Sequence, residues 1–160
     1  MRRKVMSICC ILTLVVSMLF ISAKDVQAAS DDLILDGSYL THDNESIGYD
    51  TKITRGVDLL TGYSKCVRLG SGKLYAGGTT IAAHTVENVQ VSVLIERAKD
   101  ADDTWSSYDG WHTENTNADR VGSNRALAVE GGYYYRVRCT HSANSDVSSS
   151  FTDGVYIEEP

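Results

Sequence analysis

The sequence predicts an all-β protein, a single antiparallel β-sandwich of about seven strands that follows an N-terminal signal peptide. Two segments, 88–98 and 133–141, alternate apolar with polar residues, which is the pattern of half-buried strands. Glycine-containing turns separate further short β-like runs, and no window after residue 28 has convincing helical periodicity. Short strands at this spacing are typical of a sandwich.

Residues 1–28 have the organisation of a signal peptide. Basic residues occupy positions 2–4, and no charged residue occurs over 5–23. The segment Val26-Gln27-Ala28-Ala29 places small residues where a signal peptidase needs them, so we expect a Sec-type signal peptide that is cleaved after Ala28, and secretion of the remainder. The alternative is an uncleaved anchor, because 19 uncharged residues could just span a bilayer.

After this cleavage the protein would be strongly acidic. The first 28 residues hold four of the 15 basic side chains and one of the 21 acidic ones, which leaves 11 basic, 20 acidic and a net charge of −9. Nucleic acids and anionic membranes bind proteins through Lys and Arg patches, so we expect neither as a partner. We expect an extracellular ligand, a glycan or a protein, and no stable membrane insertion.

Two cysteines, Cys66 and Cys139, remain after the leader is removed. A single cysteine pair in an exported protein usually forms a disulfide. The chain-entropy model gives a loop of this length roughly 4 kcal/mol of stabilisation. We therefore expect a Cys66–Cys139 disulfide, and the alternative is a pair of small, buried side chains with free thiols.

A polar and acidic segment, residues 29–50, precedes the predicted domain at 51–160. We expect this segment to be a loosely held lead-in, because it offers little apolar surface to bury. The first two strands of the domain are expected at 63–69 and 73–83. The turn residues Gly70-Ser71-Gly72 separate them.

The clearest strand covers residues 88–98, where Val and Ile alternate with more polar residues. A charged hairpin loop at 99–103 leads to its expected partner strand at 104–112. Residues 113–124 are polar, so we expect them to be a connection to the next strand at 125–129.

A tight turn at Glu130-Gly131-Gly132 precedes the second strong strand, 133–141. The residues expected on one face are Tyr133, Tyr135, Val137, Cys139 and His141. Those expected on the other face are Tyr134, Arg136, Arg138 and Thr140. The last strand is expected at 154–158.

The run Gly132–Arg138 resembles the late strand of fibronectin type III and immunoglobulin-like sandwiches. Together with the alternation at 89–95, two following tryptophans and Thr140-His141, it is similar to small exported β-sandwich proteins of Gram-positive bacteria. The resemblance covers residues 60–157 and implies a fold and a compartment, but no chemistry, since that family is functionally uncharacterised. The chain departs from the immunoglobulin pattern at Val137, where a tyrosine is expected.

No pattern in the sequence indicates a catalytic residue, a cofactor or a metal site. The four histidines lack the close spacing of zinc ligands, so we expect them on the surface or at its rim. The aspartates of 100–103 resemble half of a calcium loop, but Trp105 and Trp111 stand where an EF-hand needs Gly and an acid. We expect a solvated hairpin tip there, and calcium bound between loops is the alternative.

Aromatic side chains are the one suggestive group of candidates. Trp105 and Trp111 are six residues apart, so a regular strand would place both on one face with Tyr108 on the other, unless Asp109-Gly110 forms a bulge. Exposed aromatic rings can stack on sugars, whereas a sandwich tryptophan usually fills the core, and we expect the core for at least one of the two. The predicted ligand-binding residues are Trp105, Tyr108, Trp111 and Tyr134.

These observations favour a secreted, non-catalytic binding or interaction module that acts at the cell exterior. The alternative is a secreted effector of a bacteriocin-like or toxin-like kind, since such effectors are also small exported β domains. An enzyme of unrecognised type is the third interpretation, because no nucleophile–base or paired-carboxylate context is visible in the sequence.

Overall fold

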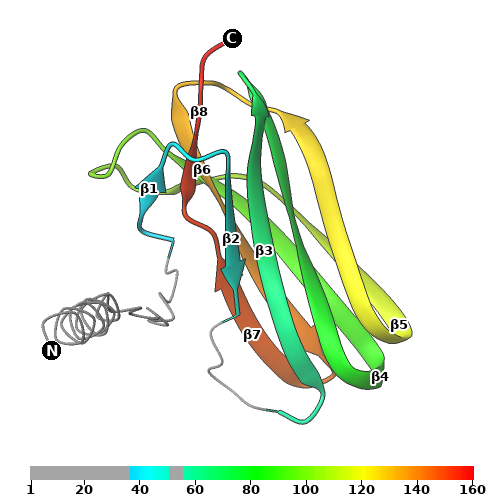
Figure 1. Ribbon diagram of the computed structural model, residues 1–160. Helices are drawn as coiled ribbons and strands as arrows, with labels where there is room; N and C mark the ends of the chain where they lie inside the picture. The colour runs from blue at the N-terminus through cyan, green and yellow to red at the C-terminus, as the bar shows by residue number, and fades with distance from the viewer. Residues whose placement is uncertain (1–36, 51–55) are drawn as a thin grey trace, which may run out of the picture. The chain divides into compact units, whose positions relative to one another are not determined.

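The computed structural model describes residues 37–50 and 56–160 of the chain (Figure 1). The predicted signal peptide, its cleavage site and the first part of the lead-in segment lie outside the described residues. The chain divides into two units, residues 1–33 and 34–160, and the fold described below belongs to the second unit. The described residues include no helix of the length and hydrophobicity that crossing a membrane requires.

The described residues form eight strands and no helix, so the predicted all-β fold class is confirmed. In chain order the strands are β1 (Leu40–Thr41), β2 (Glu45–Tyr49), β3 (Leu59–Gly70), β4 (Lys73–Ala98), β5 (Ser106–Ala128), β6 (Tyr133–Ala143), β7 (Asp146–Phe151) and β8 (Gly154–Ile157). The predicted turns are also present, since Gly72 and Gly132 have positive φ angles of 64° and 81°.

The strands belong to one mixed sheet with the order β1-β8-β6-β4-β3-β2, in which β5 also pairs with β4 and β7 with β6. All neighbours are antiparallel except β1 and β8, which run parallel with Leu40 opposite Gly154. The expectation of a purely antiparallel arrangement is therefore wrong for this pair. A two-residue strand can pair in parallel here because the long chain between residues 41 and 154 provides the crossover.

The sheet curls because β4 and β5 are long and bend along their length (Figure 1). β4 joins two segments predicted as separate strands, 73–83 and 88–98. Its first part pairs with β3 and its second part with β6, with a register shift against β5 between Ile81 and Val86. The curl packs β3 against β6 and β7, with which it does not pair as a strand. The result is a half-barrel built from one continuous sheet.

The apolar core lies on the inner face of this curl. The predicted alternations supply much of it, because Val89, Val91, Val93, Ile95, Tyr135, Val137, Cys139, Val155 and Ile157 are all buried. Arg138 and Thr140 alternate with the buried residues of β6 and are exposed. The face assignment from the sequence is therefore confirmed for this strand.

Part of the predicted lead-in belongs to the fold, since β1 and β2 lie within residues 29–50. β2 pairs antiparallel with β3, and its buried residues are Ser46 and Gly48. A Cβ atom on Gly48 would overlap the carbonyl oxygen of Phe151, so β2 packs where only a glycine fits. Small buried residues give no hydrophobic alternation, which is why this strand looked like polar lead-in.

The polar segment 113–124 is also strand, contrary to the expected connection. It joins the predicted strands 104–112 and 125–129 into the single strand β5. β5 lies along the border of the sheet and most of its side chains are exposed, so polar residues are compatible with a strand there. The remaining unpredicted strand, β7, buries two serines, Ser148 and Ser150, and carries little apolar signal.

Cys66 and Cys139 are free thiols in the structure, so the expected disulfide is not present. Both are buried, and each donates a weak hydrogen bond to a carbonyl: Cys66 to Tyr135 at 3.3 Å and Cys139 to Gly77 at 3.8 Å. Tyr135 and Cys139 are four residues apart on β6, about 13 Å along a strand. The two thiols therefore occupy different parts of the core.

Candidate ligand-binding surface

A β-bulge in β5 separates Trp111 from Trp105, two of the four predicted aromatic residues. Ile95 pairs with Asp109, but the next residue, Glu96, pairs with Ser107, so Tyr108 is an extra residue on β5. Trp111 lies opposite Val93 on the core side of the sheet. Trp105 lies beyond the bulge and packs on the outer face. The bulge that Asp109-Gly110 suggested is thus present at Tyr108, and the two tryptophans do not share a face.

Trp111 is half-buried and packs against the apolar core. Its indole Nε1 donates to Ser123 Oγ at 3.0 Å, and the Arg125 guanidinium lies 4.4 Å from the centre of its ring. Ser123 and Arg125 belong to the second part of β5, so Trp111 holds the two parts of this bent strand together. These contacts give Trp111 a packing role.

Tyr108 belongs to the same inner group. Its ring meets Tyr135 edge to face at 5.3 Å, and the Arg97 guanidinium lies 5.3 Å from the ring centre. Arg97 also stacks on Tyr133 and forms an ion pair with Glu130 at 2.7 Å. Tyr108 is 37% exposed, so it borders the core without being enclosed by it.

Trp105 lies on the opposite, outer face of β6 and β8. The Arg136 guanidinium is 4.2 Å from the centre of its ring. A Cβ atom on Gly154 would lie 2.7 Å from Trp105 Cη2 and 2.8 Å from Leu40 Cδ2, so the indole and Leu40 cover this glycine closely. These contacts attach the end of the β4–β5 hairpin loop to the outer face.

The charged groups beneath Trp105 form a mostly buried ion pair. Arg136 Nε lies 2.8 Å from Glu96 Oε2, and the two side chains are only 13% and 10% exposed. Arg136 also donates to the carbonyl oxygen of Gly37 at 2.6 Å. The predicted outward stripe of Tyr134, Arg136 and Arg138 is therefore present, but Arg136 is engaged within the protein and Arg138 is exposed.

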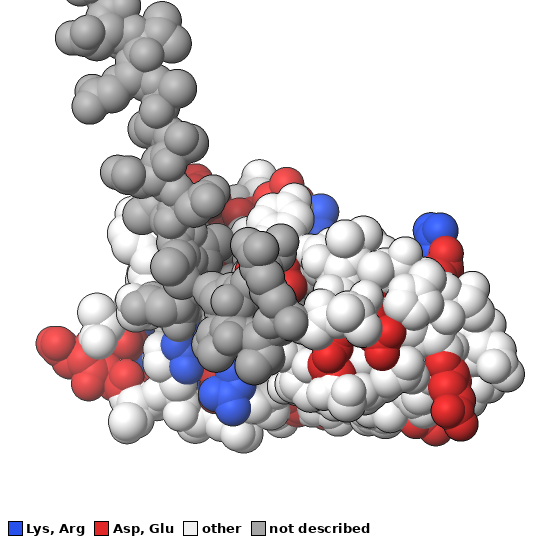
Figure 2. Space-filling view, turned by 90° about the horizontal axis from the view of Figure 1, so that it is seen from below, with Lys and Arg blue, Asp and Glu red and all other residues white. Residues whose placement is uncertain are grey.

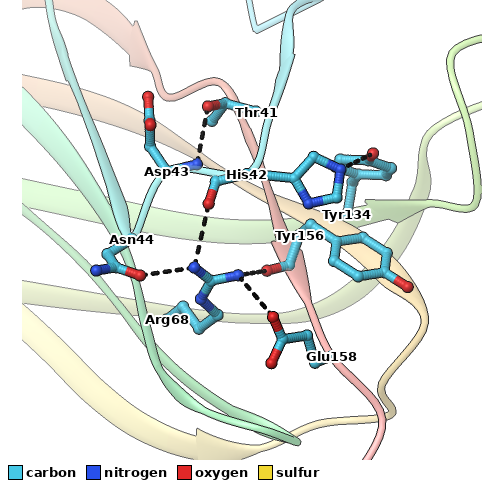
Figure 3. A network of polar contacts seen from close by, with 8 residues as sticks. All are labelled: Thr41, His42, Asp43, Asn44, Arg68, Tyr134, Tyr156 and Glu158. Carbon is cyan, nitrogen blue, oxygen red and sulfur yellow. Dashed lines mark hydrogen bonds and ion pairs between the residues drawn. The ribbon is translucent and has the colours of Figure 1, made fainter.

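Tyr134 lies in a cluster of three rings with His42 and Tyr156 (Figure 3). Its hydroxyl is 3.1 Å from His42 Nε2, its ring centre is 5.0 Å from that of Tyr156, and the His42 and Tyr156 ring centres are 4.9 Å apart. His42 comes from the β1–β2 loop, and the tyrosines come from neighbouring positions on β6 and β8. Sequence reasoning missed His42 and Tyr156 as members of a site.

Arg68 holds the His42 loop in place from the end of β3 (Figure 3). It donates to the His42 carbonyl at 3.1 Å, to Asn44 Oδ1 at 2.6 Å and to the Tyr156 carbonyl at 3.4 Å, and it forms an ion pair with Glu158 at 3.5 Å. One guanidinium thus connects the loop with β8. Arginine suits this role because its planar fork offers several donors in fixed directions.

Trp105 and the three-ring cluster occupy successive rows of the outer face. Leu40 pairs with Gly154 beneath Trp105, and Tyr134 pairs with Tyr156 two residues further along β8. We call Trp105, Tyr134, Tyr156 and His42 the aromatic surface. Trp105, Tyr134 and Tyr156 are partly buried and His42 is exposed, so part of each ring borders solvent on this face. No set of three potential metal-ligating residues is close enough to bind a metal anywhere among residues 37–50 and 56–160.

His141 is not on the surface or rim, as the sequence analysis expected, but fully buried. Its Nε2 lies 2.7 Å from Ser150 Oγ, and its Nδ1 lies 2.8 Å from Thr80 Oγ1. Thr80 donates to the Gln90 carbonyl, so it can accept from Nδ1–H, and Ser150 can donate to Nε2. Burial lowers the pKa of His141 to about 4. This serine–histidine–threonine chain therefore holds a neutral imidazole in the core, away from any substrate.

Comparisons with known proteins give little support to any assignment. No protein-family model and no curated protein matches the chain. Among solved structures it is similar to the sporulation control protein Spo0M from Bacillus subtilis, with 6% sequence identity and a TM-score of 0.39. The match covers 74% of this chain and 51% of Spo0M, so the chain spans about half the length of that protein.

Proposed function

We propose that this protein is a secreted, non-catalytic binding module that recognises a glycan at the cell exterior through its aromatic surface. The observation that carries the proposal is the placement of Trp105, Tyr134, Tyr156 and His42 on one outer face. Apolar ring faces with a few fixed polar groups are the usual composition of a small-ligand site. A pyranose ring presents an apolar face to such rings and hydroxyls to the polar groups.

The rings are supported from below, which favours a binding role for them. The Glu96–Arg136 ion pair holds the Trp105 ring, and Arg68 holds the His42 loop. Side chains that are already ordered lose less conformational entropy when a ligand binds.

Charge supports a neutral or basic ligand over a nucleic acid. Figure 2 shows one face on which acidic side chains form several groups and basic side chains are fewer. The negative net charge of the chain opposes phosphate backbones in the same way. Among polymers found outside cells, uncharged glycans therefore fit better than nucleic acids.

Secretion of the protein and an immunoglobulin-like sandwich topology are also part of this proposal. Secretion rests on residues 1–28, and the Gram-positive setting rests on the resemblance at residues 60–157. An immunoglobulin-like sandwich remains a proposal for the topology. The packing of β3 against β6 and β7 supports it, whereas the continuity of β4 and β5 through the bend argues for a curled sheet.

A glycan-binding screen with aromatic variants tests the proposal. The exported protein, recovered from culture medium, is screened against peptidoglycan, mucin and plant polysaccharides. We expect Tyr134→Ala and Tyr156→Ala to weaken binding at least tenfold, because each removes a ring from the aromatic surface. Tyr49→Ala is the matched control, since Tyr49 is 66% exposed on β2, away from this surface, and should leave binding unchanged.

Two results would contradict the proposal. The first is that the parent binds no glycan in the screen. The second is that Tyr134→Ala and Tyr156→Ala both bind glycan as tightly as the parent does. Melting temperatures of the variants show whether a loss of binding reflects unfolding. In the case of no binding, growth inhibition of other bacteria by the parent protein would favour the secreted-effector alternative.

A further inference from the structure

The far edge of β5 is the longest unpaired strand edge in the described part of the chain. β5 pairs with β4 along almost its whole length, while β3 and β6 occupy the other side of β4. Among the described residues no strand pairs with β5 on its second side (Figure 1). Backbone N–H and C=O groups along this edge are thus available to another strand.

Natural proteins usually protect such an edge with short length, charged side chains (lysine above all), proline or bulges. The protection that β5 has consists mainly of its charged residues, which are Asp109, Glu114, Asp119, Arg120 and Arg125. β5 has 23 residues, compared with about 5–6 in an average strand, and it contains neither lysine nor proline. Its irregularities are the bulge at Tyr108, the register shift against β4 between Ile81 and Val86, and a positive φ of 50° at Asn117. Most of the strand is therefore open to pairing.

The charges of β5 are complementary about Asn117. Asp109 and Arg125 stand eight residues on either side of it, and Glu114 and Arg120 stand three residues on either side. In an antiparallel pair of two β5 strands centred on Asn117, each acid would face a base of the other copy. Opposite charges directly across a strand pair are stabilising, and like charges are destabilising.

The same register keeps each charge pair on one face of the sheet. Glu114 and Arg120 pair with Gln90 and Ile81 of β4, whose side chains point away from the core. Asp109 and Arg125 pair with Ile95 and Ala76, which point into it. Strand pairing requires this agreement, because a slip of one residue would put every partner on the opposite face.

Side-chain sizes agree with this register as well. Two large residues of the first part of β5 would face two small residues of the second part in the other copy. The pairs are Trp111 with Ser123 on the inner face and His112 with Gly122 on the outer face, while Tyr108 is the extra residue of the bulge and has no direct partner in this register. A bulky side chain opposite a small one packs without collision.

We propose that two copies of this chain associate through antiparallel pairing of their β5 strands, about a twofold axis at Asn117. The twofold axis would pass through Asn117, perpendicular to the sheet where β5 bends. It would place the first part of each β5 strand beside the second part of the other copy's β5, so the two half-barrels would form one continuous curled sheet. Each Glu114–Arg120 and Asp109–Arg125 pair would occur twice, as twofold symmetry requires. β-strand addition supplies affinity through main-chain hydrogen bonds.

Two backbone groups of β5 are bonded to side chains of the same strand. Asn115 donates to the Arg120 carbonyl at 3.0 Å, and the Gly110 N–H donates to Asp109 Oδ1 at 2.8 Å. Where these groups face the second copy, pairing must replace these hydrogen bonds, which reduces the net gain. We therefore expect a reversible dimer whose population depends on protein concentration.

Charge reversal on the outer face tests the proposal. The exported protein and its variants are compared by sedimentation over a concentration series. Glu114→Arg and Arg120→Glu should each weaken association at least tenfold, since each creates two like-charge pairs. The double variant Glu114→Arg/Arg120→Glu should restore the parent's association. Glu45→Arg makes the same charge change on β2 at the opposite side of the sheet and should have no effect.

Other outcomes would overturn the proposal. A parent protein that stays monomeric up to millimolar concentration excludes the dimer. Dimers that tolerate both single reversals place the contact elsewhere, and a double variant that fails to recover excludes the Glu114–Arg120 register. Melting curves separate these outcomes from unfolding, and Glu114 and Arg120 are exposed, so little loss of stability is expected.

Discussion

At the scale of single residues, burial decides what the polar and sulfur-containing side chains can do. Glu96 and Arg136 are mostly buried as an ion pair, and His141 is buried between two hydroxyls. Glu96, Arg136 and His141 each have a hydrogen-bonding partner, which is the condition under which a polar side chain is tolerated in a core. These contacts cannot be read from the sequence, because Glu96 and Arg136 are 40 residues apart and Thr80 and His141 are 61 residues apart.

The cysteines give a prediction at this scale. Burial raises the pKa of both the Cys66 and Cys139 thiols to about 12, so only roughly one thiol in ten thousand is a thiolate at pH 8. We expect a maleimide to label neither cysteine in the native protein. Both should react after denaturation without a reductant, and the intact mass should be that of the reduced chain.

A disulfide would give a different result in the same experiment. Denaturation alone would then produce no labelling, reductant would be required, and the intact mass would be lower by two hydrogens. That outcome would show that the protein in solution differs at Cys66 and Cys139 from the structure described above. Rapid labelling of native protein would instead contradict the burial of the thiols.

At the scale of strands, the sequence predicts those with apolar alternation and misses those without it. The second part of β4 and β6 were foreseen because valines and aromatic residues recur with period two. β2 and β7 were missed because they bury Ser46, Gly48, Ser148 and Ser150, whose side chains carry no apolar signal. The middle of β5 was missed because an edge strand can be polar on both faces.

The candidate site was foreseen only in part, for a similar reason. Trp105 and Tyr134 were identified by type, but one inserted residue at Tyr108 moved Trp111 to the other face. His42 and Tyr156 join the site through the pairing of β1 with β8 and of β8 with β6. The β1–β8 pairing, which brings in His42, joins segments more than 90 residues apart, and a single sequence holds no signal for it.

Gly48 provides a test of whether β2 is firmly held. A Cβ at this position would overlap the backbone carbonyl of Phe151, so Gly48→Ala must push β2 away from β7. We expect a loss of at least 1–2 kcal/mol in the free energy of unfolding, about the size of a steric change in a packed core. Hydrogen exchange at Ile47 and Tyr49 should become faster than in the parent.

The alternative that this variant tests is the prediction from the sequence that residues 29–50 form a loosely held lead-in. If residues 40–49 were loosely held, Gly48→Ala would change neither the free energy of unfolding nor the exchange rates. Ala replaces Gly at a β position with a small intrinsic gain, so local propensity alone would stabilise the variant slightly. A neutral or stabilised Gly48→Ala protein would therefore contradict the packing of β2 described above.

At the scale of the whole molecule, the curl of the sheet separates three surfaces by role. The inner face forms the core, the outer face of β6 and β8 carries the aromatic surface, and the free edge of β5 carries the proposed dimer contact. Because Glu114 and Arg120 have no contact with the aromatic surface, the glycan and dimer experiments can succeed or fail independently. A glycan-binding monomer would support the first proposal and remove the second.

The stability of the whole molecule should fall in mild acid because of His141. Its pKa is about 4 in the folded protein and close to the ordinary 6.5 when unfolded, so the folded state keeps the imidazole neutral while the unfolded state binds a proton. The stabilisation that the neutral, buried imidazole provides is therefore present in full above pH 6.5 and is lost as the pH falls from 6.5 through 4. The size of the effect is at most about 3 kcal/mol. Chemical denaturation at a series of pH values measures it.

His141→Gln supplies the comparison, because glutamine can hydrogen-bond to Thr80 and Ser150 but does not titrate. We expect this variant to be less stable than the parent at pH 7 and to lose the slope between pH 6.5 and 5, where few carboxylates titrate. His84→Gln is the control, since His84 is 56% exposed and pairs with Asp58 at the surface, and it should keep the slope. A slope that survives in His141→Gln would assign acid sensitivity to another group and contradict the neutral, buried imidazole.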